Sequence, residues 1–189
     1  MKPIFSYQLS TLFIFLFTFC ATISAAPRIA ILDFELNDIT SLPNTAQEIS
    51  RTASIKPFLE QALSQQGDYQ FIQISPAQQK AANPGFGYLF KFDENAADLA
   101  NQYGADWIIV GQHSKPSFLF SYLMVHVVNV KTGKLIGRYE LELKGNHEKV
   151  TRRGTRKLAQ KISVLISSYK PQKIINSETS LVPEHLLEN

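Results

Sequence analysis

A short, almost entirely apolar run near the middle of the chain places the strongest constraint on its fold. Residues Ala105 to Gly111 read ADWIIVG, which is the length of a strand and leaves no regular polar face. A strand of this composition is typical of the centre of a sheet that is covered on both faces. The rest of the chain must therefore supply neighbouring strands and also helices to cover that sheet.

The segments before this run predict two strands and a helix between them. The apolar run from Arg28 to Leu36 and the alternating segment from Tyr69 to Ile74 are typical of strands, and the loop after the first strand contains Asp38. Apolar residues recur at helical spacing from Asn44 to Gln66. Pro57 lies inside this helical segment, so we expect a kink or a break there.

Shorter helices and a hairpin complete the pattern. A helix is predicted over 77–82, and another runs from Asp93 to Tyr103 with Gly104 as its stop. The segments from Leu119 to Val130 and from Leu135 to Lys144 predict antiparallel strands around a tight turn. In the second of these strands, one buried face is expected to carry Leu135, Tyr139, Leu141 and Leu143.

This order of elements predicts the fold class. We expect a single α/β domain over residues 26–169, built on a mixed β-sheet of about five strands flanked by helices. Residues 170–189 are polar and contain Pro171 and Pro183, so this segment is predicted to be a flexible C-terminal tail.

The first 25 residues are typical of a secretory signal peptide. Lys2 is the only charge before Arg28, the run from Leu9 to Ile23 is largely apolar, and small residues end the segment. Cleavage is expected after Ala25, with Ala26 as the alternative. If the segment is not cleaved it is a membrane anchor, and it is the only contact with a membrane that the sequence predicts. The protein is therefore predicted to be periplasmic.

Composition narrows the chemistry that is open to the exported domain. Cleavage removes Cys20, the only cysteine, so we expect no disulfide and no thiol chemistry. The chain has 19 basic and 16 acidic residues, a balance that argues against a nucleic-acid partner. Glycine-rich phosphate loops are absent, and no local metal-ligand spacing is formed by the histidines at 113, 126, 147 and 185. We therefore predict no cofactor and no metal.

Polar residues follow two of the predicted strands. His113 and Lys115 come after the central strand, and Asp38 comes after the first one. If these strands are parallel, the three side chains meet at the edge where open α/β sheets commonly bind ligands. A small-ligand carrier or an enzyme at this edge is one hypothesis. The sequence contains no G-x-S-x-G nucleophile elbow, however, and the alternative is a set of ordinary loop residues. No catalytic residue is assigned.

The last helix is expected to carry the most basic surface of the protein. Its first residue is Asn146, whose side chain is predicted to cap the first turn. Arg153 lies on one helical ridge with two lysines, and the basic patch around it consists of Lys149, Arg152, Arg156 and Lys157. This face is either simply solvated or binds an acidic protein, a lipid headgroup surface or a polyanion. Arg153 is also a candidate partner for a carboxylate such as that of Asp38.

Aromatic residues form the other candidate surface. Trp107 lies inside the central strand and is predicted to be core. Others crowd a segment rich in glycine and proline, where they form either an exposed patch for a partner or a satellite core under a loop: Phe86, Tyr88, Phe90 and Phe92, together with Phe118 and Phe120.

Several stretches of the sequence resemble a known family. They are ILDFELNDIT, GADWIIVGQHSKPS, MVHVVNVKTGKLI and KGNHEKVTRRGTRKL, and the last contains the most specific motif, formed by Gly145, Asn146, Glu148, Arg153 and Gly154. The chain resembles an exported bacterial family of unknown function whose members are often encoded beside PQQ-dependent (quinoprotein) alcohol dehydrogenases. It is more distantly similar to the amino-terminal domain of TolB and to the periplasmic domain of the curli secretion lipoprotein.

The resemblance implies a TolB-like α/β fold and an association with a quinoprotein dehydrogenase system. Relatives carry cysteines where this chain has Asn95 to Ala97, and a tryptophan where Val150 or Thr151 stands. Functions that need those groups do not carry over. The functional prediction is a periplasmic, non-enzymatic accessory or binding protein with a protein partner, and the alternative is the ligand site at Asp38, His113 and Lys115.

Overall fold

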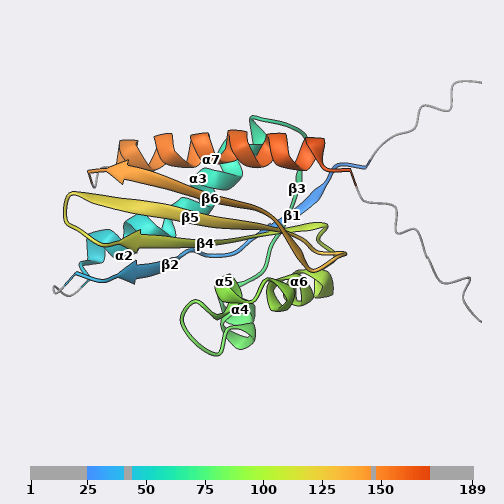
Figure 1. The fold of residues 1–189 in the computed structure, drawn as a ribbon, viewed down its shortest axis with the longest axis horizontal. Helices are drawn as coiled ribbons and strands as arrows, with labels where there is room; N and C mark the ends of the chain where they lie inside the picture. The colour runs from blue at the N-terminus through green and yellow to red at the C-terminus, as the bar shows by residue number, and fades with distance from the viewer. Residues whose placement is uncertain (1–24, 41–43, 146–147, 171–189) are drawn as a thin grey trace, which may run out of the picture.

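The computed structural model describes residues 25–40, 44–145 and 148–170 of the chain. Their helices and strands follow one another in an α/β order that ends with a long helix (Figure 1). In chain order they are β1 (Arg28–Ile31), β2 (Glu35–Asp38), α2 (Ala46–Ala53), α3 (Ile55–Ser64), β3 (Gln70–Ile72), α4 (Pro76–Ala82), α5 (Tyr88–Lys91), α6 (Asp93–Gln102), β4 (Trp107–Lys115), β5 (Phe120–Asn129), β6 (Lys134–Lys144) and α7 (Glu148–Ser168).

The strands form one mixed sheet with β4 at its centre. The strand order is β3-β1-β4-β5-β6, and β2 pairs with β4 further along the same edge as β1. Strands β1, β2 and β3 are parallel to β4 or to each other, whereas β5 and β6 continue the sheet as an antiparallel hairpin. The predicted α/β fold class with a mixed sheet is confirmed.

The described sheet has six strands because the first apolar run forms two of them. The interruption lies at Asp33, whose backbone N–H donates to Gln79 Oε1 at 2.8 Å and whose carbonyl accepts from Gln79 Nε2 at 2.9 Å. These two bonds attach Asp33 to helix α4 in place of the strand ladder. The pairing with β4 then resumes in β2, so Asp38 belongs to a strand and the prediction of a loop there is wrong.

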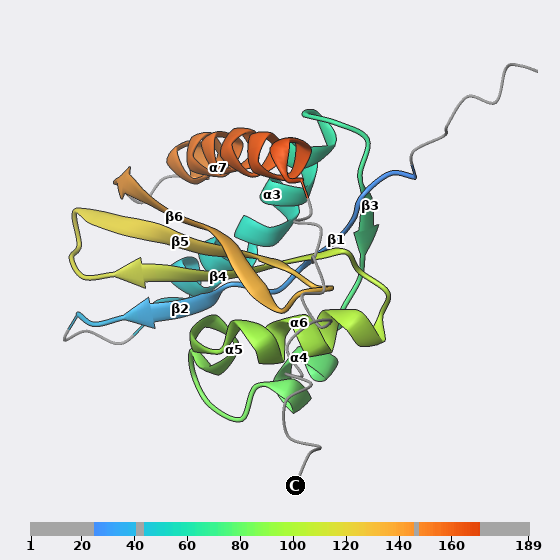
Figure 2. The same cartoon turned by 45° about the vertical axis from the view of Figure 1, so that its right-hand side comes forward.

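Helices cover both faces of the sheet, as the apolar central strand requires (Figures 1 and 2). Helices α3 and α7 lie on one face, and α4, α5 and α6 lie on the other. Strand β4 supplies alternate side chains to two cores: Trp107 and Ile109 join the α3–α7 core, while Ile108 and Val110 join the α6 core. Trp107 is buried, and this prediction is confirmed.

The break in the first long helix follows from Pro57. Helix α2 ends at Ala53 and α3 begins at Ile55, so Pro57 occupies the first turn of α3. A proline ring clashes with the carbonyl four residues earlier, here that of Ala53, but in a first turn its missing N–H costs nothing. The break between the two helices therefore lies at Ser54, before the proline rather than at it.

The prediction that Leu135 shares a buried face of β6 with Tyr139, Leu141 and Leu143 is wrong for Leu135. The pairing of β5 with β6 shifts register between Val127 and Val128, which face Gly137 and Leu135. The extra residue, Ile136, turns toward the α3–α7 core, and Leu135 packs into the opposite core instead. A bulge of this kind reverses the inward and outward alternation along a strand.

Candidate functional site

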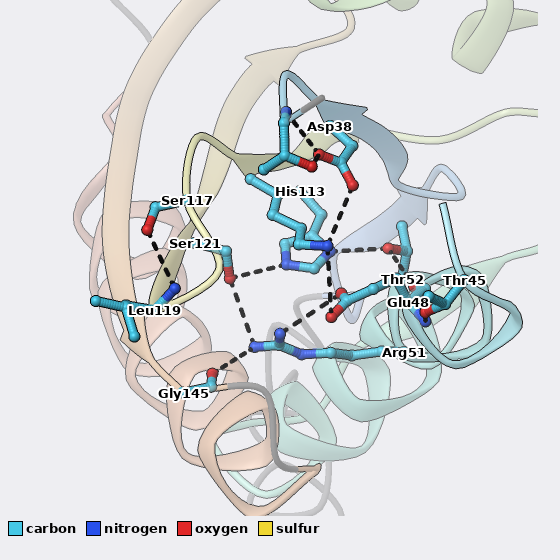
Figure 3. Close-up of polar contacts among 12 residues, drawn as sticks. Asp38, Thr45, Glu48, Arg51, Thr52, His113, Ser117, Leu119, Ser121 and Gly145 are labelled. Atoms are coloured by element: carbon cyan, nitrogen blue, oxygen red, sulfur yellow. Dashed lines mark hydrogen bonds and ion pairs between the residues drawn. The ribbon is translucent and has the colours of Figure 1, made fainter. Parts of the chain in front are cut away.

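The strand-end residues predicted from the sequence come together in space. Strand β4 extends to Lys115, so His113 and Lys115 lie within the strand and do not follow it. Strand β2 runs parallel to β4, with Leu36 opposite His113 and Asp38 opposite Lys115. The parallel arrangement that was a condition of the sequence hypothesis is therefore present, and the group lies beside helix α2 (Figure 3).

Asp38 and Lys115 form a buried ion pair. Lys115 Nζ lies 3.2 Å from Asp38 Oδ2 and 3.9 Å from Glu48 Oε1 of α2. The other oxygen of Asp38 accepts from the Thr40 hydroxyl at 2.6 Å and from the Thr40 backbone N–H at 2.9 Å. Burial alone would raise the pKa of Asp38, but the hydrogen bonds from Thr40 and Lys115 outweigh it and lower that pKa below its ordinary value.

His113 is completely buried, and both of its ring nitrogens are hydrogen-bonded. The Thr52 hydroxyl donates its proton to the Glu48 carbonyl at 2.9 Å. The 2.8 Å contact between His113 Nδ1 and Thr52 Oγ1 must therefore be an Nδ1–H donation to Thr52. Nε2 is then the unprotonated nitrogen, and it accepts from the Ser121 hydroxyl at 2.9 Å. A neutral imidazole with one defined tautomer satisfies the whole chain of bonds.

Arg51 closes the group on its other side. Its Nε donates to Thr151 Oγ1 of α7 at 2.9 Å, and its Nη2 donates to the Gly145 carbonyl at 3.2 Å. A longer contact of 3.5 Å joins Nη2 to Ser121 Oγ, and Nη1 lies 3.7 Å from Glu48 Oε2. One guanidinium thus connects helix α2 with strand β5, with the start of α7 and with the chain just before it.

The network holds the His113 ring in its neutral form. Burial, with the neighbouring positive charges of Arg51 and Lys115, lowers the pKa of His113 from 6.5 to about 4. An imidazole of this kind carries no second proton, and so no charge, at neutral pH, and hydrogen bonds occupy both of its nitrogens. The group is chemically arranged to bind its own members together, and its geometry offers no exposed acid, base or nucleophile.

Glu48, Arg51, Thr52 and Ser121 were not identified from the sequence. A signal was nevertheless present in α2, which reads AQEISRTA. Its polar residues at 48, 51 and 52 share one helical face, and they are buried, while the large apolar Ile49 is 56% exposed. A helix with this reversed polarity indicates a polar interior, but only the tertiary structure shows which strand faces it.

Arg153 does not belong to this network. Asp38 is paired with Lys115, whereas Arg153 is exposed on α7 and lines a hollow of about 240 Å³ beside β6. The other residues of the predicted basic patch are exposed as well. Arg152 pairs with Glu148 at 2.6 Å, and its guanidinium stacks 3.8 Å from the centre of the Phe58 ring. The predicted cap, Asn146, lies outside the described residues.

The predicted aromatic group divides into separate parts. Phe90 stacks on His126 with ring centres 4.0 Å apart, and it packs against the α6 core. Phe86 and Phe92 are exposed on either side of α5. Phe118 is exposed in the turn between β4 and β5, which lies at one end of the sheet (Figure 1).

The predictions about the membrane and about metal binding can be compared with the structure only for the described residues. Residues 1–24 of the predicted signal peptide, Cys20 among them, and the tail from 171 onward lie outside them. Within residues 25–40, 44–145 and 148–170, no helix combines the length and apolar character needed to cross a bilayer. The same residues contain no group of three or more histidine, cysteine or carboxylate side chains placed to hold a metal ion.

Solved structures with a similar fold come from several bacteria. The hypothetical protein CT253 from Chlamydia trachomatis has a TM-score of 0.51 at 11% identity, over 76% of this chain and 99% of that one. This likeness shows a shared fold. The LpoB C-terminal domain from Salmonella enterica gives 0.44 at 16% identity, over 65% of this chain and 86% of its own. TolB from Acinetobacter baumannii gives 0.43 at 14% identity, over 76% of this chain and 28% of TolB.

Sequence comparison places the chain in a family. Among curated proteins, none matches it. The model of the DUF3280 family, described as "Protein of unknown function (DUF2380)", matches residues 27–162. This range contains the strand-end network, every strand of the described residues and most of α7. Because the match extends over most of its length, the chain belongs to the DUF3280 family of proteins of unknown function.

Proposed function

We propose that this chain is an exported, non-enzymatic accessory protein of the periplasm that binds a protein partner. The observation that carries the proposal is the closed state of the strand-end group. His113 is fully buried with both nitrogens bonded, and Asp38 and Lys115 are paired. An enzyme or a carrier at this edge needs an open cavity and unpaired groups. The group instead stabilises the scaffold, which leaves the outer surface for function.

Export rests on the N-terminal sequence. Lys2, the apolar run from Leu9 to Ile23 and the small residues before Pro27 support a signal peptide that is cleaved after Ala25. Mass spectrometry of the protein purified from periplasm gives its N-terminus directly. A chain that begins at Ala26 supports the proposal, and a chain that retains Lys2 in the membrane fraction contradicts cleavage.

The α5 surface is the best-supported site for the partner. We define it by exposed Phe86 and Phe92 and by the adjoining hollow of about 480 Å³, which residues 91–95 and 133–135 line. Glu35 anchors the loop before α5, because its carboxylate accepts from Asn83 Nδ2 at 2.7 Å and from the Gly87 N–H at 2.9 Å. One exposed ring, Phe86, lies on this anchored loop, and the other, Phe92, lines the hollow after α5. Exposed aromatic rings beside a hollow are features of a protein-binding surface.

The proposed partner is the quinoprotein alcohol dehydrogenase system that the family resemblance suggests. The test measures binding of the purified mature protein to the purified PQQ-dependent dehydrogenase of the same organism by calorimetry. Replacing both rings (F86A with F92A) is expected to weaken binding at least tenfold, because aromatic residues at interface centres carry most of the binding energy. F118A is the matched control, since it removes an equally exposed ring elsewhere.

Two results would contradict this proposal. Undiminished affinity in the double variant would remove the α5 surface from the interface. Native mass spectra that show a small molecule bound in equal amount to the purified chain, and lost on K115M substitution, would favour the carrier or enzyme at Asp38, His113 and Lys115.

A further inference from the structure

Three exposed apolar side chains gather at one end of the sheet. Ile39, Phe118 and Leu119 are 66%, 58% and 76% exposed, and we call them the apolar tip. The Ile39 N–H donates to the Lys115 carbonyl at 3.2 Å, which holds the end of β2 against the β4–β5 turn. The Leu119 carbonyl accepts from the Gly145 N–H at 2.9 Å, which joins the same turn to the end of β6.

Basic side chains of β6 and of the first turns of α7 lie toward the same end of the molecule as this tip. Helix α7 begins at the same end of the molecule as the β4–β5 turn (Figure 1). Residues 142–157 contain six basic and two acidic side chains. One of the acids, Glu148, is already bonded to Arg152. Lys144, Arg153 and Lys157 line one hollow between β6 and α7 together with the other acid, Glu142, and these four residues are exposed.

The buried network around His113 anchors the backbone on both sides of the tip. Asp38 fixes Thr40 just after Ile39, and Arg51 binds the Gly145 carbonyl. The apolar side chains therefore project from an anchored surface, and they need not reorganise in order to bind. Such preorganisation reduces the entropy cost of association.

We propose that this end of the domain docks onto an anionic phospholipid bilayer. The apolar tip enters the interface, while the basic residues of β6 and α7 contact the headgroup phosphates. An anionic bilayer offers both environments, with hydrocarbon beneath a layer of negative charge. The apolar side chains at the tip protrude from the molecule, and the hydrocarbon of a bilayer can deform around them. This contact is additional to any N-terminal anchor, and it is separate from the α5 surface.

Vesicle sedimentation tests the proposal with the chain purified after export, every variant carrying the same N-terminus. We expect binding to vesicles of equal phosphatidylglycerol and phosphatidylcholine, and little binding to phosphatidylcholine alone. F118S with L119S is expected to lower partitioning at least tenfold, because two exposed apolar groups no longer enter the interface. Each of R153Q and K157Q is expected to lower it about fivefold at low salt. F86S with F92S is the matched control and should bind as the wild type does.

The tip variants should fold because the replaced side chains are exposed. Melting temperatures equal to that of the wild type would establish this. Absence of wild-type binding to the anionic vesicles overturns the proposal. Equal binding by the wild type and by F118S with L119S also overturns it, because adsorption then depends on charge alone. If the tip variant loses affinity for the dehydrogenase while vesicle binding is unchanged, the tip is a protein-docking surface. That outcome would also remove F118A as the control of the α5 test, whereas the vesicle results leave the α5 test unchanged.

Discussion

Lys115 and Asp38 occupy opposite positions on two parallel strands, and their charged groups lie 3.2 Å apart in the protein interior. The carboxyl ends of parallel strands are where open α/β sheets commonly bind ligands. Here Thr40 bonds to Asp38, and Glu48 of α2 lies 3.9 Å from the Lys115 ammonium. The consequence is a polar core that stabilises one end of the sheet, and its energetics can be measured.

Removing the charge of Lys115 should destabilise the fold. K115M leaves the buried carboxylate of Asp38 without its cation, and we expect the free energy of unfolding to fall by about 3 kcal/mol. Urea denaturation monitored by circular dichroism measures this loss. R28M is the control, because the Arg28–Asp106 pair has a shorter contact of 2.8 Å but is largely exposed. Comparable losses in the two variants would show that burial does not strengthen the Lys115 pair.

Stability should depend on pH through His113. Its pKa is about 4 in the folded protein and near 6.5 when exposed, so the unfolded chain takes up the proton first. Through His113 the folded state is therefore expected to lose about 3 kcal/mol as the pH falls from 6.5 to 4, and His113 contributes no further loss below that range. Equilibrium unfolding across this window measures the slope.

A histidine replacement separates the His113 contribution from that of a second buried histidine. Burial also lowers the pKa of His126, so His126 contributes in the same direction. We expect H113Q to flatten most of the slope and H126Q to flatten less of it. If H113Q has the same pH dependence as the wild type, the assignment of a neutral, depressed His113 is wrong.

Gly111 is required by the close packing of Phe34. A Cβ atom at this position would lie 2.3 Å from the Phe34 ring, well inside van der Waals contact. G111A is expected to lower the free energy of unfolding by about 2 kcal/mol, and F34L in the same chain should restore part of it. G85A provides the comparison, because nothing lies within 4 Å of a Cβ there. Thermal unfolding of the four proteins measures these differences.

Arg51 should couple helix α2 to the start of α7. R51K keeps the positive charge but loses the planar set of donors that reaches Thr151 and Gly145 together. We expect faster amide hydrogen exchange in the first turns of α7, with little change in α6 on the opposite face of the sheet. Mass spectrometry of exchanged peptides measures both. Uniform acceleration in α6 and α7 would indicate a general loss of stability instead.

Much of the fold was predictable because hydrophobic periodicity reports burial directly. The central strand, the β5–β6 hairpin and the α6 and α7 segments follow from their apolar patterns, with Gly104 and Pro57 as boundary signals. The pattern failed where side chains redirect the backbone. Gln79 interrupts the first strand at Asp33, and a bulge moves Leu135 to the other core. Both effects depend on partners distant in the sequence.

The candidate site was predictable in part. Placement of Asp38, His113 and Lys115 at one edge followed from parallel strands, which the chain order suggested. The hydrogen bonds that tie these residues into a buried network were not predictable. Arg51, one member of the network, comes from a helix that was predicted only from its apolar spacing. Nor could the separation of Arg153 from Asp38 be predicted, since it depends on the packing of α7.

The sequence by itself determined the α/β class, the mixed sheet and the family, because burial periodicity and motif spacing are local properties of the chain. Only the tertiary structure decided what the polar residues do. It placed Glu48, Arg51 and Thr52 beside the strand ends, where burial with the charges of Arg51 and Lys115 keeps His113 neutral and hydrogen bonds hold its tautomer. Because those bonds join segments up to 100 residues apart, the state of His113 depends on packing that no local pattern records.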